Sequence, residues 1–358
     1  MNVLVVAPYI YDTAPGQRFR IEQWARILER RGVAFTFVPF ETRALHAVMY
    51  RPGFVGRKTA EVVRGLVGRL RLLRQLSRFD VVFLFREAAP IGPPIVERLM
   101  ARRRVPIVYD FDDSIYLPNA SAANRIFASL KCVGKVGTIC GLSRCVTVGN
   151  GHLQRFAEPR ARRVCVLPTT VDVERFVPRG PRREDGPVVI GWMGSETTLP
   201  HLMLAAEPLR ELAARRRFVL HVVSTREVSM AGVEVRSTRW SAEREVRDLQ
   251  SFDIGIMPLP DDPWTRSKCG AKLLLCMGVG VPGVTSPVGV NTDIVDDGVN
   301  GFLVRTDADW VSKLSALIDS PTLRACMGTA ARRTVEARFS GQAVAPMLLD
   351  IFRHCGKD

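Results

Sequence analysis

Short runs of β-branched and aromatic residues alternate along the chain with longer stretches whose apolar positions repeat at helical spacing. In the first half, this pattern predicts a series of strands separated by helical segments. The expected strands are Val3–Ala7, Ala34–Phe40, Asp80–Phe85, Val105–Tyr109, Cys145–Val148 and Val164–Leu167. Such an alternation is typical of a parallel, doubly wound α/β sheet.

The same alternation starts again after residues 178–187, a polar segment rich in proline and glycine that we interpret as a linker. The strands expected there are Val188–Trp192, Phe218–Val223, Ile254–Met257 and Pro282–Thr285. The main helices expected across the chain are Gln17–Arg31, Arg57–Phe79, Leu199–Arg215, Ala242–Ser251, Cys269–Gly278, Asp307–Asp319 and Thr322–Phe352. We therefore expect two Rossmann-like domains, residues 1–177 and 188–339, that face a central ligand-binding cleft.

The charge of the chain is unevenly distributed. Its 358 residues include 51 Lys+Arg and 36 Asp+Glu, a formal net charge of +15. Residues 1–180 hold 29 basic and 14 acidic side chains, whereas residues 181–358 hold 22 of each. This asymmetry indicates an anionic partner for the first half, such as a nucleic acid, a membrane surface or an anionic substrate.

The eight cysteines form no C-x-x-C pair, and no histidine cluster accompanies them. We therefore expect reduced thiols, no zinc site and a cytoplasmic protein. The N-terminus has no basic segment before its apolar run, which favours a first strand over a signal peptide.

Basic residues fall on roughly one face of the expected helix Arg57–Phe79. They are Arg57, Arg64, Arg71 and Arg78, extended by Lys58 and Arg74. Two interpretations remain open: contact with an anionic membrane surface, or a solvated face on a helix that packs against its own sheet. We expect no nucleic-acid partner, because Phe79 is the only aromatic residue of the segment and no recognition module is visible.

The clearest chemical motif is residues 264–284, WTRSKCGAKLLLCMGVGVPGV. Lys268 and Lys272 are four residues apart at the start of an expected helix, so their ammonium groups share one face. A helix N-terminus with two cations is well suited to bind phosphate. Two glycine-containing segments follow, Ser286–Asn291 and Gly298–Leu303.

Together with Val166–Phe176, Ile190–Ser195 and Asp253–Leu259, this region resembles the GT-B glycosyltransferases of family 4, the glycosyl transferases group 1. The resemblance covers nearly the whole chain but is patchy before residue 100. It implies a nucleotide-sugar donor bound by the second domain, transfer to an acceptor hydroxyl with retention of configuration, and no metal or other cofactor. It also implies that a C-terminal helix, residues 340–358, packs back on the first domain.

The resemblance and the charge together predict a glycosyltransferase with a membrane-associated or lipid-linked acceptor, active in envelope or exopolysaccharide glycan synthesis at the inner face of the cell membrane. Two alternatives remain. One is a catalytically inactive scaffold that binds sugar nucleotides. The other is a different GT-B enzyme, such as a nucleotide-sugar epimerase.

The sequence departs from the family pattern at two glutamate positions, which fall on Ser267 and Leu275. A leucine cannot hold ribose hydroxyls as the second glutamate does in the family. The family's Arg and Lys pair falls near Ser195 and Pro200, beside His201. Phosphate binding would then rest on Arg266, Lys268, Lys272 and the backbone of Gly194 and Ser195. Further nucleotide or sugar contacts are expected from Pro258, Leu259, Asp262, Ser267 and Leu275.

The first half offers candidates where two strands end. After the first strand, Gly16 is a candidate for donor or phosphate binding, because a glycine permits close approach of the backbone. Arg18 and Arg20 are candidates to bind a phosphate of donor or acceptor. A surface pair on a capped helix is the alternative for these arginines.

After the fourth strand come three carboxylates, Asp110, Asp112 and Asp113, which repel one another unless a cation or a basic partner is near. We expect Asp112 or Asp113 to bind hydroxyls and to assist removal of the acceptor proton. Helix capping is the alternative for each of them, and pairing with Arg18 or Arg20 is another.

Overall fold

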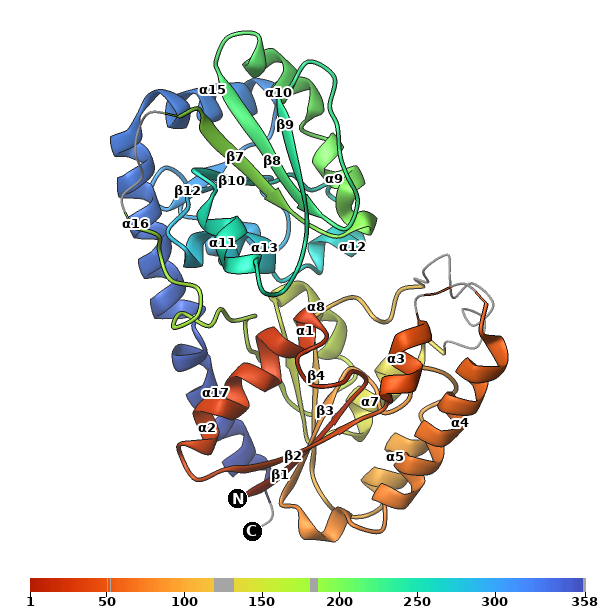
Figure 1. Cartoon of the computed structure of the whole chain (residues 1–358). Coiled ribbons are helices and arrows are strands. Elements are labelled where there is room, and N and C mark those ends of the chain that lie inside the picture. The colour runs from red at the N-terminus through yellow and green to blue at the C-terminus, as the bar shows by residue number, and fades with distance from the viewer. Residues whose placement is uncertain (50, 52, 119–131, 181–185, 357–358) are drawn as a thin grey trace. The chain divides into compact units, whose positions relative to one another are not determined.

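The computed structural model describes residues 1–356 except 50, 52, 119–131 and 181–185 (Figure 1). The chain forms two compact units, one of Met1–Thr169 with Val344–Asp358 and one of Thr170–Ala343. Each unit is built on a six-stranded sheet in which neighbouring strands are parallel. The expected fold class of two doubly wound α/β sheets is confirmed. The segment 178–187, expected as a linker, lies in the second unit, and its residues 181–185 fall outside the described part.

The sheet of the first unit has the order β2-β1-β3-β4-β5-β6. Its strands are β1 (Asn2–Ala7), β2 (Ala34–Pro39), β3 (Val81–Phe85), β4 (Ile107–Phe111), β5 (Cys145–Val148) and β6 (Val164–Val166). Its helices are α1 (Pro15–Gln17), the π-helix η1 (Arg18–Glu22), α2 (Gln23–Glu29), α3 (Arg43–Met49), α4 (Val55–Leu72), the 3₁₀ turn η2 (Leu76–Arg78), α5 (Ile95–Ala101), α7 (Lys135–Leu142), α8 (Gly151–Ala157) and most of α17 (Gly341–Cys355).

Helices α2 and α17 cover one face of this sheet, and α5 and α7 lie on the other (Figure 1). Trp24 of α2 and Phe352 of α17 are fully buried against β1 and β3. Burying side chains of this size contributes about 2–3 kcal/mol each. The last helix of the chain is therefore part of the core of the first unit.

The sheet of the second unit has the order β12-β11-β10-β7-β8-β9. Its strands are β7 (Val188–Met193), β8 (Phe218–Ser224), β9 (Val235–Arg239), β10 (Ile254–Met257), β11 (Gly283–Thr285) and β12 (Gly301–Leu303). Its helical segments are η4 (Glu196–Thr198), α9 (Leu199–Met203), α10 (Ala206–Ala213), α11 (Glu245–Gln250), α12 (Pro263–Arg266), α13 (Ala271–Gly278), α14 (Asn291–Ile294), α15 (Asp307–Asp319) and α16 (Pro321–Arg338).

Helix α13 lies directly against the second sheet because glycines face it. A Cβ atom at Gly283 would come within 2.2 Å of Leu273 Cδ1, and one at Gly255 within 2.8 Å of Cys276 Sγ. Side chains at either position would push the helix away. The close packing fixes the start of α13, and with it Lys272, at the carboxyl edge of the sheet.

The expected helix Gln17–Arg31 is interrupted. Arg20 has φ −122° and ψ −113°, inside the π-helical segment between α1 and α2. The side chain of Arg20 points into the unit and forms an ion pair with Asp110. The apolar pattern of a helix does not predict such a pair.

The expected basic helix also differs from the prediction. Helix α4 ends at Leu72, so Arg78 lies on the separate turn η2. Lys58, expected on the basic face, is instead buried and its Nζ donates to the Arg51 carbonyl at 2.7 Å. The outward face carries apolar side chains as well as arginines, since Val63 and Val67 are 53% and 40% exposed. Among the described helices, none has the length and apolar character needed to cross a bilayer.

Candidate functional site

The candidate donor site is built at the carboxyl edge of the second sheet. Gly194 and Ser195 directly follow β7, and Pro258 and Leu259 directly follow β10. Helix α13 begins beside these loops and carries Lys272 in its first turn. Carboxyl ends of neighbouring parallel strands meet at one edge, where open α/β sheets bind ligands.

Lys272 is held in one place by its neighbours. Its Nζ donates to Thr198 Oγ1 at 2.8 Å and lies 4.6 Å from the centre of the Trp192 ring. A Cβ atom on Gly194 would lie 2.7 Å from the same nitrogen and 2.4 Å from the Trp192 ring. The absence of a side chain at Gly194 therefore leaves the space that the ammonium group occupies.

The electrostatic environment of this edge favours an anion. Burial, followed by repulsion from Lys268, lowers the pKa of Lys272 to about 7. Burial and the same two ammonium groups lower the pKa of His201, and its Nδ1 is buried without a hydrogen-bond partner among the described residues. Lys268 Nζ lies 4.4 Å from the centre of the Trp264 ring. A bound diphosphate would relieve the repulsion between the two lysines and meet the amino end of α13.

The other predicted donor residues have local partners. Arg266 is exposed, and its Nε donates to Asp261 Oδ1 at 2.6 Å. Asp262 caps α12 by accepting a hydrogen bond from Thr265 N at 2.8 Å. The hydroxyls of Ser195 and Thr197 are 2.9 Å apart.

Pro258 and Leu259 are buried, and the backbone N of Leu259 donates to Ser286 Oγ at 3.0 Å. These two residues fix the course of the loop after β10.

The two positions that depart from the family pattern are both buried. Ser267 Oγ donates to the Trp264 carbonyl at 2.6 Å, and the Leu275 residue is only 5% exposed. The Leu275 side chain has no polar group with which to hold ribose hydroxyls, and the Ser267 hydroxyl is buried.

The first unit carries a separate pocket of about 240 Å³ at the carboxyl ends of β1, β2 and β3. It is lined by Tyr9, Thr13, Ala14, Pro15, Gly16, Glu41, His46 and Arg86. A Cβ atom at Gly16 would lie 2.8 Å from Asp112 Oδ2 and 3.2 Å from Arg86 Nη2. Gly16 therefore allows these two charged side chains to lie directly against the backbone.

Arg86 and Asp112 form an ion pair beside this pocket, with Nη2 and Oδ1 2.8 Å apart. Arg86 has φ +59°, a strained value for a residue with a side chain, and it follows β3 immediately. Burial alone would raise the pKa of Asp112, but attraction to Arg86 and then to Arg20 lowers it. The Asp112 carboxylate is thus a stable anion and a good hydrogen-bond acceptor, and a weak base.

Arg20 does not have the ligand-binding role expected from the sequence. Its side chain is 0% exposed, and its Nε and Nη2 donate to the two carboxylate oxygens of Asp110 at 2.7 and 2.5 Å. Its Nη1 donates to the Leu167 carbonyl at 2.8 Å, and Thr147 Oγ1 donates to Asp110 at 2.6 Å. The pair is structural, because no surface of either side chain is left for a ligand.

The remaining two candidates of the first unit are also partly or fully enclosed. Arg18 is buried, with its guanidinium carbon 4.9 Å from the centre of the Phe19 ring. Asp113 is half-buried, and its Oδ1 accepts a hydrogen bond from Ser114 N at 3.0 Å.

Three further residues of the first pocket, Glu41, His46 and Arg86, were not predicted from the sequence. His46 Nδ1 lies 2.9 Å from Glu41 Oε2, and both side chains line the same cavity as Arg86. None belongs to a recognisable motif. Glu41 and Arg86 each follow the carboxyl end of a strand, and only that position could have identified them.

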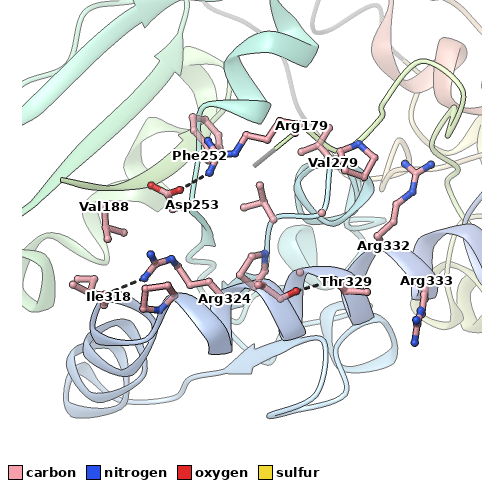
Figure 2. Close-up of a pocket in the computed structure, with 18 of the residues that line it drawn as sticks. Arg179, Val188, Phe252, Asp253, Val279, Ile318, Arg324, Thr329, Arg332 and Arg333 are labelled. Carbon is pink, nitrogen blue, oxygen red and sulfur yellow. Dashed lines mark hydrogen bonds and ion pairs between the residues drawn. The ribbon is translucent and has the colours of Figure 1, made fainter. Parts of the chain in front are cut away.

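A larger pocket of about 840 Å³ lies in the second unit at the opposite edge of the sheet, beside Val188, Asp253 and Pro282, at the amino ends of β7, β10 and β11 (Figure 2). Three of its arginines, Arg179, Arg324 and Arg332, hydrogen-bond to the surrounding chain. Arg179 Nη2 donates to Asp253 at 2.5 Å, and Arg332 donates to backbone carbonyls, including that of Val173 at 2.9 Å. None of the predicted site residues is among the described residues that line it.

Comparison with known proteins supports the assignment of the second unit. Residues 188–320 match the family model of the glycosyl transferases group 1. A stretch of 79 residues is 29% identical to spore coat protein SA of Bacillus subtilis (strain 168), and it spans 21% of this chain and 21% of that protein.

Solved structures resemble the whole chain. Sucrose-phosphate synthase from Thermosynechococcus elongatus superposes with a TM-score of 0.69 at 12% identity, over 99% of this chain and 98% of that chain. A glycosyltransferase from Rickettsia africae ESF-5 superposes with a TM-score of 0.69 at 13% identity, over 99% of this chain and 98% of that chain. Anabaena HepE, solved with UDP and glucose, superposes with a TM-score of 0.65 at 13% identity, over 99% of this chain and 100% of that chain. At these identities the likeness establishes the fold, which is GT-B.

The motifs of the donor region, the fold of both units and the family match of the second unit agree with one another. The chain has the GT-B fold, and its residues 188–320 match the glycosyl transferases group 1.

Proposed function

We propose that the protein transfers a sugar from a nucleoside diphosphate sugar to an acceptor hydroxyl, with retention of configuration. The observation that carries this proposal is Lys272. Its ammonium group lies beside Gly194 at the carboxyl edge of the family domain, in the first turn of α13. Charge builds up on the leaving diphosphate during transfer, and fixed cations at that point stabilise it more than the bound donor.

In this proposal Lys268 and the backbone at Gly194 and Ser195 complete the diphosphate site. Two ammonium groups repel each other before the donor binds, and the diphosphate removes that repulsion. A uridine nucleotide is the first donor to test, because the related HepE structures contain UDP, glucose and UDP-glucose.

The pocket of the first unit is proposed to receive the acceptor hydroxyl. Asp112, with its lowered pKa, would accept a hydrogen bond from that hydroxyl, and Asp113 lies next to it in the chain. The Glu41–His46 pair offers a better proton acceptor, because a carboxylate that orients one ring nitrogen leaves the other available as a base.

A membrane-associated or lipid-linked acceptor, as in envelope or exopolysaccharide synthesis, is supported by helix α4. Its outward face combines exposed Val63, Val67 and Leu70 with exposed arginines, among them Arg57 and Arg71. Such a face matches the surface of an anionic bilayer, to which each arginine contributes about 1 kcal/mol.

Calorimetry with UDP-glucose tests the donor proposal. Lys272→Ala should weaken binding at least about tenfold, since a charge-assisted contact is worth roughly 1.5–3 kcal/mol. Lys313→Ala is the matched control, because it removes the same charge from α15. An unchanged affinity of the Lys272 variant would reject the phosphate assignment. If no nucleotide sugar of uridine, guanosine or adenosine binds, the transferase proposal fails.

Flotation with phosphatidylglycerol vesicles at low salt tests the membrane proposal. The double change Arg57→Ala and Arg71→Ala should weaken vesicle binding roughly 30-fold, from about 2 kcal/mol of lost attraction. Arg217→Ala with Arg305→Ala removes the same charge from the second unit and should leave flotation unchanged. Failure of the wild-type protein to float would leave the α4 face as a solvated surface.

A second candidate function is an inactive sugar-nucleotide-binding scaffold. The buried Ser267 and Leu275 favour it, because both family glutamates are missing and Leu275 cannot hold ribose hydroxyls. Tight donor binding without release of nucleoside diphosphate on lipid extracts would support the scaffold over the enzyme.

A further inference from the structure

Residues 8–16, which run from the end of β1 into α1, form most of one wall of the first-unit pocket. Five of the eight described residues that line this pocket belong to this loop: Tyr9, Thr13, Ala14, Pro15 and Gly16. Asp12 in the same loop has φ +61°, a left-handed value that is strained for a residue with a side chain. Such a conformation persists only where contacts hold it, so the contacts of this loop decide the shape of the pocket.

Two buried side chains, Gln17 and Glu22, hold this loop. Gln17 Oε1 accepts a hydrogen bond from the backbone N of Tyr9 at 3.3 Å, and Gln17 Nε2 donates to the Tyr9 carbonyl at 3.1 Å. Glu22 Oε2 accepts from the backbone N of Asp12 at 2.9 Å. Gln17 Nε2 also donates to Glu22 Oε1 at 2.6 Å, which joins these contacts into one network. Both residues are 1% exposed, and neither is among the described residues that line the pocket, so they act on it through the loop.

The π-helical segment η1 brings these two side chains together. They are five residues apart, and in an α-helix a step of five residues turns by about 140°, so the two would point in different directions. Here the backbone N of Gln23 donates to the Arg18 carbonyl, which is the i to i+5 bond of a π-helix. The wider turn puts residues five apart on one face. Arg20 departs from helical φ and ψ inside this turn, where its side chain pairs with Asp110.

We propose that Gln17 and Glu22 are positioning residues of the sugar transfer, because they hold the loop in the shape with which it lines the acceptor pocket. The inference rests on the proposed function, which places the acceptor hydroxyl in this pocket. Without the pair, Asp12 is free to leave its strained conformation, and the wall that includes Tyr9 and Thr13 moves with it. A displacement of about 1 Å far from the reacting atoms can slow a reaction about 100-fold.

The buried carboxylate of Glu22 offers a variant that separates positioning from stability. Burial raises the pKa of Glu22, although the hydrogen bonds from Gln17 and Asp12 lower it, so its charge is costly to keep in the fold. Glu22→Gln has nearly the same shape and avoids that cost. However, the new amide group turns an N–H toward one of the two donors that the carboxylate accepts. The two effects oppose each other in stability, so the melting temperature should change little while the loop is released.

Turnover and hydrogen exchange of the full-length protein test the proposal. The initial rate of UDP release from UDP-glucose is measured on a dilute lipid extract, so that it reports kcat/KM for the acceptor. Glu22→Gln should lower this rate by about tenfold to 100-fold, while calorimetry finds the dissociation constant for UDP-glucose unchanged within about twofold. Backbone amides of residues 8–16 should exchange faster, and those of β3 should not. Asp80→Asn is the matched control, because Asp80 Oδ2 also accepts a backbone N–H, from Asn2 at 2.7 Å, but directly before β3 at the opposite edge of the sheet.

Exchange of the two side chains provides a rescue. The double change Gln17→Glu with Glu22→Gln again pairs one amide with one carboxylate and leaves an oxygen for the Asp12 backbone N, but it cannot donate to the Tyr9 carbonyl. It should therefore recover part of the lost rate. Equal rates for Glu22→Gln and Asp80→Asn would overturn the inference, and so would a slow Glu22→Gln variant whose loop exchanges as in the wild type. If the wild-type protein releases no UDP, the proposed function itself fails, and the inference fails with it.

Discussion

Lys272 lies between two charge states at neutral pH, because burial and Lys268 lower its pKa to about 7. A diphosphate favours the protonated form, so binding at higher pH must take up a proton from solution. The dissociation constant for UDP-glucose should therefore rise above pH 7, by up to about tenfold per pH unit until the pKa of the bound form is reached. Calorimetry from pH 6 to pH 8.5 measures this dependence.

Lys272→Arg provides the control for this pH effect. A guanidinium stays protonated throughout the range, so the variant should bind with little pH dependence above pH 7, whatever its absolute affinity. The same slope in both proteins would assign the proton to another group.

Gly194 is the second residue on which the donor site depends. An alanine there would place its Cβ 2.4 Å from the Trp192 ring and 2.7 Å from Lys272 Nζ, so the lysine must move. Gly194→Ala should weaken UDP-glucose binding about tenfold or more, and the clash with the buried Trp192 ring should also lower the melting temperature. Gly180→Ala, where a Cβ meets nothing within 4 Å, should bind as the wild type does. Equal affinities for the two variants would contradict the placement of Lys272.

Among the elements, α4 carries a buried arginine, Arg69, that bonds the helix to backbone carbonyls of the first unit. Arg69 donates to the carbonyls of Ala88, Val38 and Ala7, each at 2.8 Å. Arg69→Ala would leave these buried acceptors unpaired and should destabilise the first unit by about 3 kcal/mol. Arg71→Ala, on the exposed side of the same helix, should change stability by less than about 0.5 kcal/mol. Hydrogen exchange of peptides from β1 and β2 compares the two variants. Equal protection of these peptides in both variants would contradict the anchoring role of Arg69.

Elements with a strong apolar pattern could be predicted from the sequence, and elements held by polar contacts could not. The bounds of β5 and α15 match the prediction, because their apolar positions are regular and buried. Strands β9 and β12 were missed. The sequence of β9 is VRSTR, an edge strand that is only partly buried, and β12 is three residues long and begins with glycine.

The candidate site was predictable to a similar extent. Lys268 and Lys272 follow from a motif with fixed spacing. Which arginine pairs with which carboxylate does not follow from the sequence. Arg20 and Arg86 lie far from Asp110 and Asp112 along the chain, and only the folded sheet brings each pair together. Two roles for Arg20 were open from the sequence, a phosphate ligand or pairing with a carboxylate, and the structure shows it paired with Asp110.

At the scale of the whole molecule, the chain leaves the first unit after Thr169, completes the second unit and returns within α17. Gly194, Ser195, Lys268 and Lys272 all lie in the second unit, and its core cluster draws only on residues between Val188 and Met327. The first unit, by contrast, needs Val344–Cys355, because that segment supplies Leu348 and Phe352 to its core. The two units should therefore differ in whether they fold from one continuous piece.

Residues 170–343 produced alone should fold and bind UDP-glucose within about tenfold of the full chain, since the sheet, Gly194 and both lysines are present. Residues 1–343 should expose the face that α17 covers and lose the cooperative unfolding of the first unit, while donor binding persists. Circular dichroism and calorimetry on both fragments measure these outcomes, with Lys272→Ala in the shorter fragment as the control. A folded second unit that binds no donor would mean that the first unit supplies contacts essential to the donor site.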